Sequence, residues 1–99
     1  MTFKDIQFKE LSAEYGPDAK EGKLDLSNGY ELSIIRHKHS YGGEKGLYEI
    51  GVYHKDNKSD MVIPEGWDDS VKGWLHPEGV EIEINGLEQD EAKFEKVRA

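Results

Sequence analysis

The sequence contains no cysteine, only three prolines, and far fewer basic than acidic residues. Without cysteine, disulfide bridges, thiolate zinc sites and thiol nucleophiles are all excluded. No apolar run is long enough for a signal peptide or a membrane-spanning helix, so we expect a cytoplasmic protein. With 35% hydrophobic residues in 99, the chain has material for one modest core. We therefore expect a single domain over residues 1–99, in which the N-terminal segment and residues 89–99 can fray.

Negative charge is abundant, and it is unevenly placed. The 13 Lys and Arg against 21 Asp and Glu give a formal charge of −8. Between Asp60 and Glu91 there are ten acids and one base, a net of −9, so the remaining 67 residues sum to about +1. An acidic segment of this kind repels phosphate backbones and anionic membrane surfaces. We therefore expect no direct nucleic-acid or membrane binding, and a protein partner that is basic or itself binds nucleic acid.

Alternating apolar and polar residues, separated by glycine and asparagine, predict an antiparallel β meander. Asn28-Gly29 supplies the positive φ values of a two-residue type I′ turn between two such segments. Pro64 ends the last segment or confines it to a sheet edge, because proline cannot donate a ladder hydrogen bond. Strands are expected over residues 24–26, 30–34, 47–54 and 61–63, with a possible addition over 3–8.

The parity of the central hairpin predicts which side chains face the core. If Ile34 lies opposite Val52 and Arg36 opposite Ile50, then Leu32, Ile34, Ile50 and Val52 share one face. An apolar sheet face has to be covered by another layer, and the C-terminal third of the chain remains to provide it.

The first candidate for that cover is a short helix over residues 67–73. Asp68 and Asp69 suit the start of a helix, where carboxylates are favoured by the helix dipole. Apolar side chains follow at helical spacing, at Trp67, Val71, Trp74 and Leu75.

The second candidate, residues 77–87, has two interpretations. Residues 80–84 alternate as in a strand, which periodicity slightly favours, whereas Val80, Ile84 and Leu87 have helical spacing after Pro77. The expected fold class is α+β: an antiparallel meander of about four strands packed against one or two C-terminal helices.

Three histidines lie in the mildly basic middle of the chain. His37 and His39 are spaced to share one face of a strand and could begin a zinc or nickel site. In the register above, His54 lies opposite Leu32, about 20 Å along the strands from the other two. The three histidines cannot converge, so we expect neither a metal site nor a cofactor.

The loop over residues 41–46 contains three glycines and a lysine. It lacks the order of strand, phosphate loop and helix that defines a P-loop, and a hairpin loop whose glycines meet positive φ demands is the better interpretation. Tyrosine is favoured at protein interfaces. We therefore take Tyr41, Gly42, Gly43 and Tyr48 as candidate protein-binding residues.

The chain offers little for catalysis. None of its six serines lies in a Gly-x-Ser-x-Gly elbow, and Asp68-Asp69 are better explained by helix-start electrostatics than by acid–base chemistry. We expect no enzyme and no catalytic residue. The acidic segment has two interpretations, a solvated outer surface or an array of carboxylates that imitates phosphates, and Asp68, Asp69 and Glu78 are its candidate protein-binding residues.

Several motifs resemble a group of small proteins of tailed phages and prophages that has no established activity. NGY at 28–30, SIIR at 33–36, SYGG at 40–43 and GLYEIGV at 46–52 are similar to N-G-Y-G-x-S-V-I-R, S-Y-G-G and G-L-Y-E-L-A-V in that group. DSVKGWLHPEGV at 69–80 is similar to D-D-V-x-G-W-L-T-x-E-x-V, which a periodic helix follows there. Glu31 replaces a small residue, and Gly79 interrupts the helical segment. The resemblance spans about residues 27–87 and implies a helix over 77–87.

The resemblance also implies a setting, since small acidic phage proteins often bind and inhibit host proteins. The function we expect is that of a non-enzymatic accessory protein in the host cytoplasm, which binds and modulates or inhibits a host or phage protein. Either the loop at Tyr41 or a nucleic-acid-mimicking acidic surface would make the contact. The alternative is a structural or assembly component of the virion, and the sequence leaves the partner and the oligomeric state open.

Overall fold

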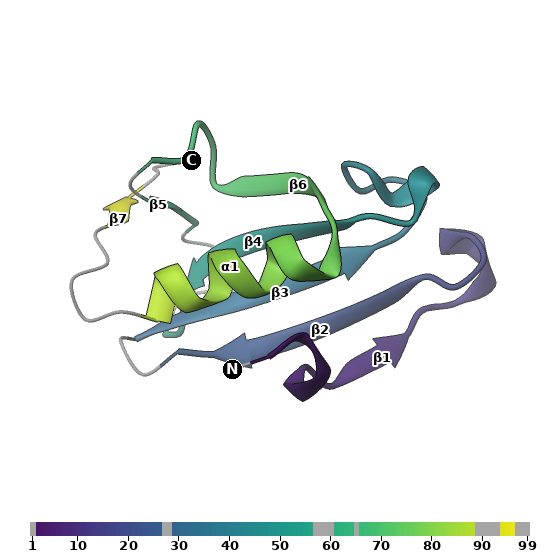
Figure 1. The fold of residues 1–99 in the computed structure, drawn as a ribbon, viewed down its shortest axis with the longest axis horizontal. Helices are drawn as coiled ribbons and strands as arrows, with labels where there is room; N and C mark the ends of the chain where they lie inside the picture. Colours follow the sequence, from purple (N-terminus) through teal and green to yellow (C-terminus); the bar gives the residue numbers. More distant parts are fainter. Residues whose placement is uncertain (1, 27–28, 57–60, 65, 89–93, 97–99) are drawn as a thin grey trace.

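A computed structural model describes residues 2–26, 29–56, 61–64, 66–88 and 94–96. Five strands form an antiparallel sheet in the order β1-β2-β3-β4-β6, and β5 pairs with β7 in a separate two-stranded sheet. The architecture is α+β, as predicted (Figure 1). The strands are β1 (Phe8–Glu10), β2 (Lys20–Asp25), β3 (Tyr30–Arg36), β4 (Tyr48–His54), β5 (Val62–Pro64), β6 (Val71–Leu75) and β7 (Phe94–Lys96). The helices are α1 (Pro77–Glu88) and three short 3-10 helices, Phe3–Asp5, Ala13–Tyr15 and Gly43–Lys45.

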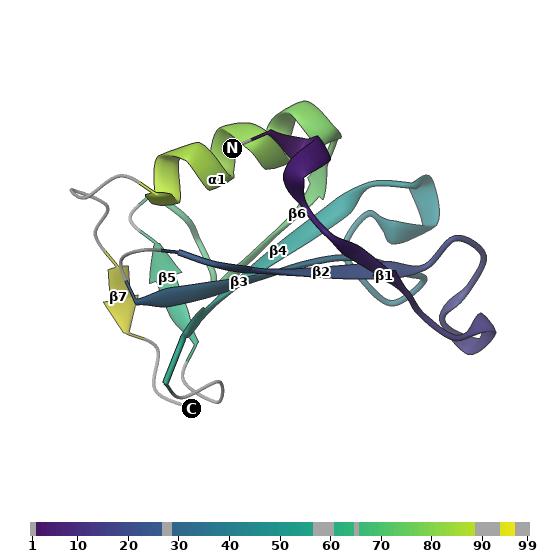
Figure 2. The ribbon, with the colours of Figure 1, turned by 90° about the horizontal axis from the view of Figure 1, so that it is seen from below.

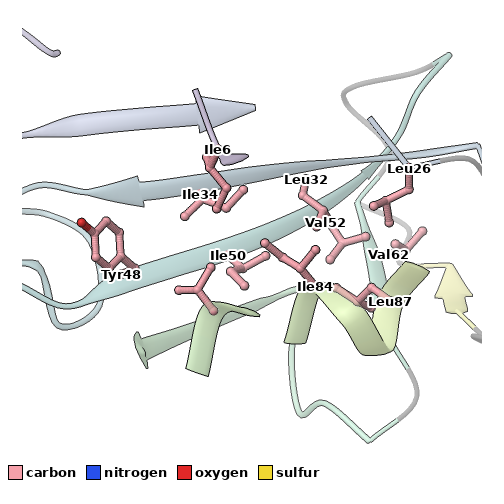
Figure 3. Packing of buried hydrophobic residues seen from close by; sticks show 11 residues of the cluster. Ile6, Leu26, Leu32, Ile34, Tyr48, Ile50, Val52, Val62, Ile84 and Leu87 are labelled. Carbon is pink, nitrogen blue, oxygen red and sulfur yellow. The ribbon is translucent and has the colours of Figure 1, made fainter. Parts of the chain in front are cut away.

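The core lies between one face of the five-stranded sheet and α1. Figure 2 shows α1 and the N-terminal segment on the same side of the sheet. Sheet, helix and N-terminal segment all contribute to the cluster, most of which is labelled in Figure 3. Its members are Ile6, Leu26, Leu32, Ile34, Tyr48, Ile50, Val52, Val62, Val80, Ile84 and Leu87.

The central hairpin confirms the predicted face but not the predicted register. Leu32, Ile34, Ile50 and Val52 are all fully buried on the face beneath α1. The pairs are Ile34 with Ile50 and Leu32 with Val52, so the strands are displaced by two residues from the predicted register. A two-residue displacement leaves every side chain on its original face, and the hydrophobic pattern therefore cannot distinguish the two registers.

The hairpin of β2 and β3 is present at the predicted place. The Leu26 amide donates to the Tyr30 carbonyl at 2.8 Å, and Gly29 has a φ of +91°. The type I′ turn itself involves Asn28, which lies outside the described residues.

The segment around residues 61–63 does not extend the meander, apart from a single bridge between Met61 and Tyr53. Instead β5 pairs with β7, so Phe94–Lys96 form a strand within the tail that was expected to fray. The rest of that tail lies outside the description. This pairing joins segments about thirty residues apart, a contact that no local pattern reports.

The predicted helix over 67–73 is wrong. Val71–Leu75 form the edge strand β6, which pairs with β4. A register shift between Tyr48 and Ile50 places two residues, Gly73 and Trp74, opposite one. The extra residue is a β-bulge, which interrupts the alternation of a strand. The bulge therefore accounts for the adjacent apolar residues Trp74 and Leu75, which contributed to the spacing that resembled a helix.

The ambiguous segment 77–87 is helical, as the resemblance implied. Val80, Ile84 and Leu87 of α1 are buried, whereas Ile82 is 70% exposed. In a strand Ile82 and Ile84 would share a face, so their opposite burial reflects the helical period. Within the described ranges no helix qualifies as a membrane-spanning segment.

Candidate functional site

The bulge in β6 turns a tryptophan outward. Lys72 pairs with Ile50 and Leu75 with Tyr48, so the extra residue returns Leu75 to the side of the core and leaves Trp74 outside the alternation. Trp74 is 58% exposed, and its φ of +60° is a left-handed conformation that bulky residues rarely adopt. The backbone is thus held in a costly conformation that presents an indole to solvent.

Tyr41, from the loop between β3 and β4, lies beside this bulge. Its carbonyl accepts the Trp74 amide at 3.1 Å, and its own amide donates to the Glu49 carboxylate at 2.7 Å. The Tyr41 side chain is also 58% exposed. Two large aromatic side chains therefore lie exposed on adjoining segments, each fixed through its backbone.

Two glycines allow this close approach. A Cβ on Gly73 would overlap the Tyr41 Cβ, and a Cβ on Gly42 would lie 2.9 Å from the Trp74 Cα. Neither position can carry a side chain without moving the loop away from β6. Gly42, Gly73 and the two hydrogen bonds of the Tyr41 backbone, one to the Trp74 amide and one to the Glu49 carboxylate, fix Tyr41 relative to Trp74.

The structure places the four loop residues predicted for protein binding in different environments. Gly42 and Gly46 do have positive φ, at 87° and 76°. Gly42 and Gly43 lie inward and support the loop, leaving Tyr41 as the exposed member. Tyr48 is only 4% exposed, so it belongs to the core rather than to a contact surface.

The packing around Tyr48 explains its burial. Its ring contacts those of Phe3 and Phe8, with centroids 5.1 and 5.7 Å away, and the Arg36 guanidinium lies 5.2 Å from the ring centroid. The alternation of β4 points Tyr48 to the same face as Ile50. That alternation was the signal in the sequence that could have placed it.

The acidic residues predicted for binding flank β6. Asp68 and Asp69 are exposed in the turn that precedes the strand, and Glu78 is exposed in the first turn of α1, which follows it. The Asp69 carboxylate accepts the Ser70 amide at 2.7 Å, so it caps this turn rather than a helix. The loop and the acidic residues, two separate predictions from the sequence, meet at one edge of the sheet.

A small hollow adjoins the first residues of β6. It has a volume of about 200 Å³ and is lined by Gly66, Trp67, Asp68, Asp69, Val71 and Lys72. Lys72 donates to Glu83 of α1 at 2.6 Å, the Trp67 indole donates to the same carboxylate at 3.1 Å, and the ammonium lies 5.8 Å from the Trp67 ring centroid. Lys72, the basic residue of β6, is therefore already paired with Glu83. Together with the Trp67 indole, which binds the same carboxylate, it links the turn before β6 to α1.

Other acids of the segment 60–91 serve the fold. Glu83 is engaged as above, and Glu81 accepts the Phe3 amide. Asp60, Glu65, Asp90 and Glu91 lie outside the described residues. Among the described residues of this segment, the exposed carboxylates that flank β6 are those of Asp68, Asp69 and Glu78. This group is smaller than the array of carboxylates along the whole segment that the sequence suggested.

The histidines do not take the predicted positions. β3 ends at Arg36, so His37 and His39 lie in a turn, where the His39 amide donates to His37 Nδ1 at 3.0 Å. His54 pairs with Tyr30 rather than with Leu32. Its Nε2 is buried without a hydrogen bond to any described residue. No cluster of three or more potential metal ligands occurs in the part of the chain that is described.

The face of the five-stranded sheet opposite α1 carries a feature that was not predicted from the sequence. A hollow of about 230 Å³ is lined by Glu21, Lys23, Glu31, Ser33 and Tyr53. Burial raises the pKa of Tyr53, and the neighbouring carboxylates of Glu49 and Glu21 raise it further. The Tyr53 ring lies over Gly51, so a glycine within a strand was the signal for it.

The prediction for Trp74 is wrong, since its helical spacing from Trp67 and Val71 placed it on the face toward the core, whereas it is 58% exposed. The signal in the sequence for the outward position of Trp74 was Gly73, because a glycine within a strand often marks a bulge.

The chain matches no protein-family model, no curated protein and no solved structure. The function is therefore inferred from the geometry of this edge of the sheet.

Proposed function

We propose that the chain is a non-enzymatic protein-binding domain that holds a basic protein partner at the edge formed by β6. The binding edge consists of Tyr41, Trp74, Asp68, Asp69 and Glu78. The observation that carries the proposal is the fixed presentation of Trp74 beside Tyr41. Tryptophan and tyrosine are enriched among residues that dominate binding energy at protein interfaces.

The negative charge of the binding edge supports a partner of positive charge. Three exposed carboxylates flank β6, two before the strand and one after it, and the lysine of β6 is paired with Glu83. Complementary charge steers a basic protein to such a surface and rejects an acidic one. Because these contacts are solvent-exposed, salt should weaken them.

A capture experiment from cell lysate tests the proposal. Immobilised protein should retain a basic partner at low salt and release it as salt is raised. Tyr41→Ala, Trp74→Ala and the triple variant Asp68→Asn, Asp69→Asn, Glu78→Gln should each lose that partner.

Two matched variants serve as controls. Tyr15→Ala removes another exposed aromatic side chain, and Glu10→Gln removes an exposed carboxylate on β1, at the opposite edge of the sheet. Both should capture the partner as the unmodified protein does. Equal capture by all variants, or a partner indifferent to salt and to these substitutions, contradicts the proposal.

The resemblance to phage proteins adds a setting to this proposal. In it, the partner is a host or phage protein that is modulated or inhibited during infection. The protein should then be recovered from infected-cell lysate and be missing from purified particles. Recovery within the particles would instead support the role of a virion structural or assembly component.

A further inference from the structure

The outer edge of β6 offers backbone groups as well as side chains. The Val52 amide donates to the Ser70 carbonyl, and Ile50 pairs with Lys72 two residues further along. In an antiparallel ladder hydrogen-bonded and non-hydrogen-bonded pairs alternate. The peptide groups of Val71, which lies between these pairs, therefore point away from β4 toward the outer edge.

That edge is the last position in the sheet. β6 ends the order β1-β2-β3-β4-β6, and it lies along the upper border of the molecule in Figure 1. An edge strand with free N–H and C=O groups can pair with an added strand from another chain. We propose, building on the function proposed above, that the partner docks as an extended basic segment that pairs with β6.

Side-chain positions along the edge define the segment further. The hollow at Trp67, Asp68 and Asp69 lies at the start of β6, and Trp74 lies near its end. Gly73 and Trp74 share one ladder position at the bulge, so Asp69 and Trp74 are four ladder positions apart, which is about 13 Å in an extended chain. The docked segment therefore places an arginine or lysine in the hollow and an apolar side chain against Trp74 about four residues away.

Charge selects this occupant over a second copy of the chain. Antiparallel pairing of two β6 edges would bring Asp68 and Asp69 of one copy toward Glu78 of the other. Like charges placed opposite each other across strands are destabilising. A basic segment meets the same carboxylates with attraction, so a heterologous partner is favoured.

A displayed library of random twelve-residue peptides provides the test. Selection against the intact protein should enrich peptides that carry arginine or lysine about four residues from a β-branched or aromatic residue. An enriched peptide should slow hydrogen exchange at the amide of Val71. The Trp74 amide, which already donates to Tyr41, is an internal reference whose exchange should change less.

Two kinds of variant separate backbone pairing from side-chain contact. Val71→Pro removes the outward N–H but spares the bonds to β4, and N-methylation of alternate peptide residues blocks the same pairing from the other side. Each should abolish binding. Asp68→Asn with Asp69→Asn should weaken binding about fivefold to tenfold, and Glu10→Gln should leave it unchanged.

The outcomes distinguish this inference from the proposed function. Peptides that need Tyr41 and Trp74 but tolerate N-methylation and leave Val71 unprotected would overturn strand addition and leave the binding edge intact. Peptides that ignore Tyr41, Trp74 and the carboxylates would overturn both. Enrichment of acidic peptides, no enrichment, or concentration-dependent self-association that protects Val71 would each overturn the basic segment as the occupant.

Discussion

Trp74 combines an unfavourable backbone conformation with an exposed side chain. For an L-residue the left-handed region costs about 1–2 kcal/mol, because the Cβ approaches the neighbouring carbonyl oxygen. At a φ of +60° this cost is present whatever the side chain, unless the residue is glycine. A position that contributes little to the core but retains this cost is consistent with a role in binding.

Substitution at Trp74 should separate stability from binding. Trp74→Gly should be more stable than Trp74→Ala by about 1 kcal/mol, since only glycine relieves the left-handed backbone. Urea denaturation of both variants measures the difference. Both should lose the partner, because both lack the indole. An alanine variant as stable as the glycine variant would show that the backbone here is not strained.

Ionisation of Tyr53 should lower the free energy of unfolding at alkaline pH. Its pKa is raised by burial, then by Glu49 and Glu21, so the folded state favours the neutral phenol. Its contribution to stability is complete below the unfolded pKa of about 10 and is lost as the pH rises through the folded value. Glu49→Gln should lower the pKa of Tyr53, and Glu21→Gln should lower it less.

NMR of ¹³C-labelled tyrosine against pH measures this titration, with Tyr53→Phe assigning the signal. In the Glu49→Gln variant the new side chain retains an oxygen that can accept the Tyr41 amide, so the loop should stay in place. A Tyr53 titration that is unchanged in both glutamine variants would contradict the electrostatic part of the cause.

At the scale of elements, α1 covers the sheet with one narrow face. Ile84 is 1% exposed and Ile82 is 70% exposed, although they are only two residues apart. Burial of apolar area is the main source of stability in a helix that packs on a sheet. The two isoleucines therefore form a matched pair within one helix.

Ile84→Ala should destabilise the protein by about 2–5 kcal/mol, because it leaves a cavity between α1 and β4. Ile82→Ala should change stability by less than about 0.5 kcal/mol, as surface substitutions do. Chemical denaturation followed by circular dichroism measures both. Equal losses would mean that residues 77–88 do not pack as this helix.

The glycines on these elements should respond in opposite directions. Gly73→Ala forces a Cβ against Tyr41 and should cost about 1–3 kcal/mol, with weakened partner capture. Gly86→Ala lies in α1 with open space around it and should stabilise by about 1 kcal/mol without affecting capture. Denaturation midpoints and the capture experiment check the pair. A tolerated Gly73→Ala would contradict the tight seating of the loop on β6.

At the scale of the whole molecule, the formal charge of −8 acts on folding and binding in opposite ways. Self-repulsion opposes the compact state, and salt screens it. Raising NaCl from about 0.01 to about 0.1 M shortens the screening length from about 30 Å to about 10 Å. The melting temperature should therefore rise over this range while partner binding weakens. Partner binding that stays constant or strengthens as NaCl is raised would contradict an electrostatic contribution to binding.

Local sequence patterns determined several elements of the fold. Asn28-Gly29 marked the connection of β2 and β3, and alternation in β3 and β4 correctly predicted Leu32, Ile34, Ile50 and Val52 as the buried face. The resemblance favoured the helix that the structure shows at 77–88. The turn and the buried face depend on turn chemistry and period, which neighbouring residues express together, whereas periodicity alone slightly favoured a strand over residues 80–84.

Only the tertiary structure decided how segments far apart in the sequence pair and pack. The register of β3 and β4 appears only in the folded structure, because a displacement of two residues preserves both faces and leaves the hydrophobic pattern unchanged. β5 found its partner in β7, and the bulge of β6 turned an apparent core residue, Trp74, into an exposed one. The sequence supplied Tyr41, Asp68, Asp69 and Glu78 as separate candidates, but only the pairing of β6 with β4 brought them to one edge. Pairing between strands depends on contacts made after the chain has closed, so no local window of sequence contains it.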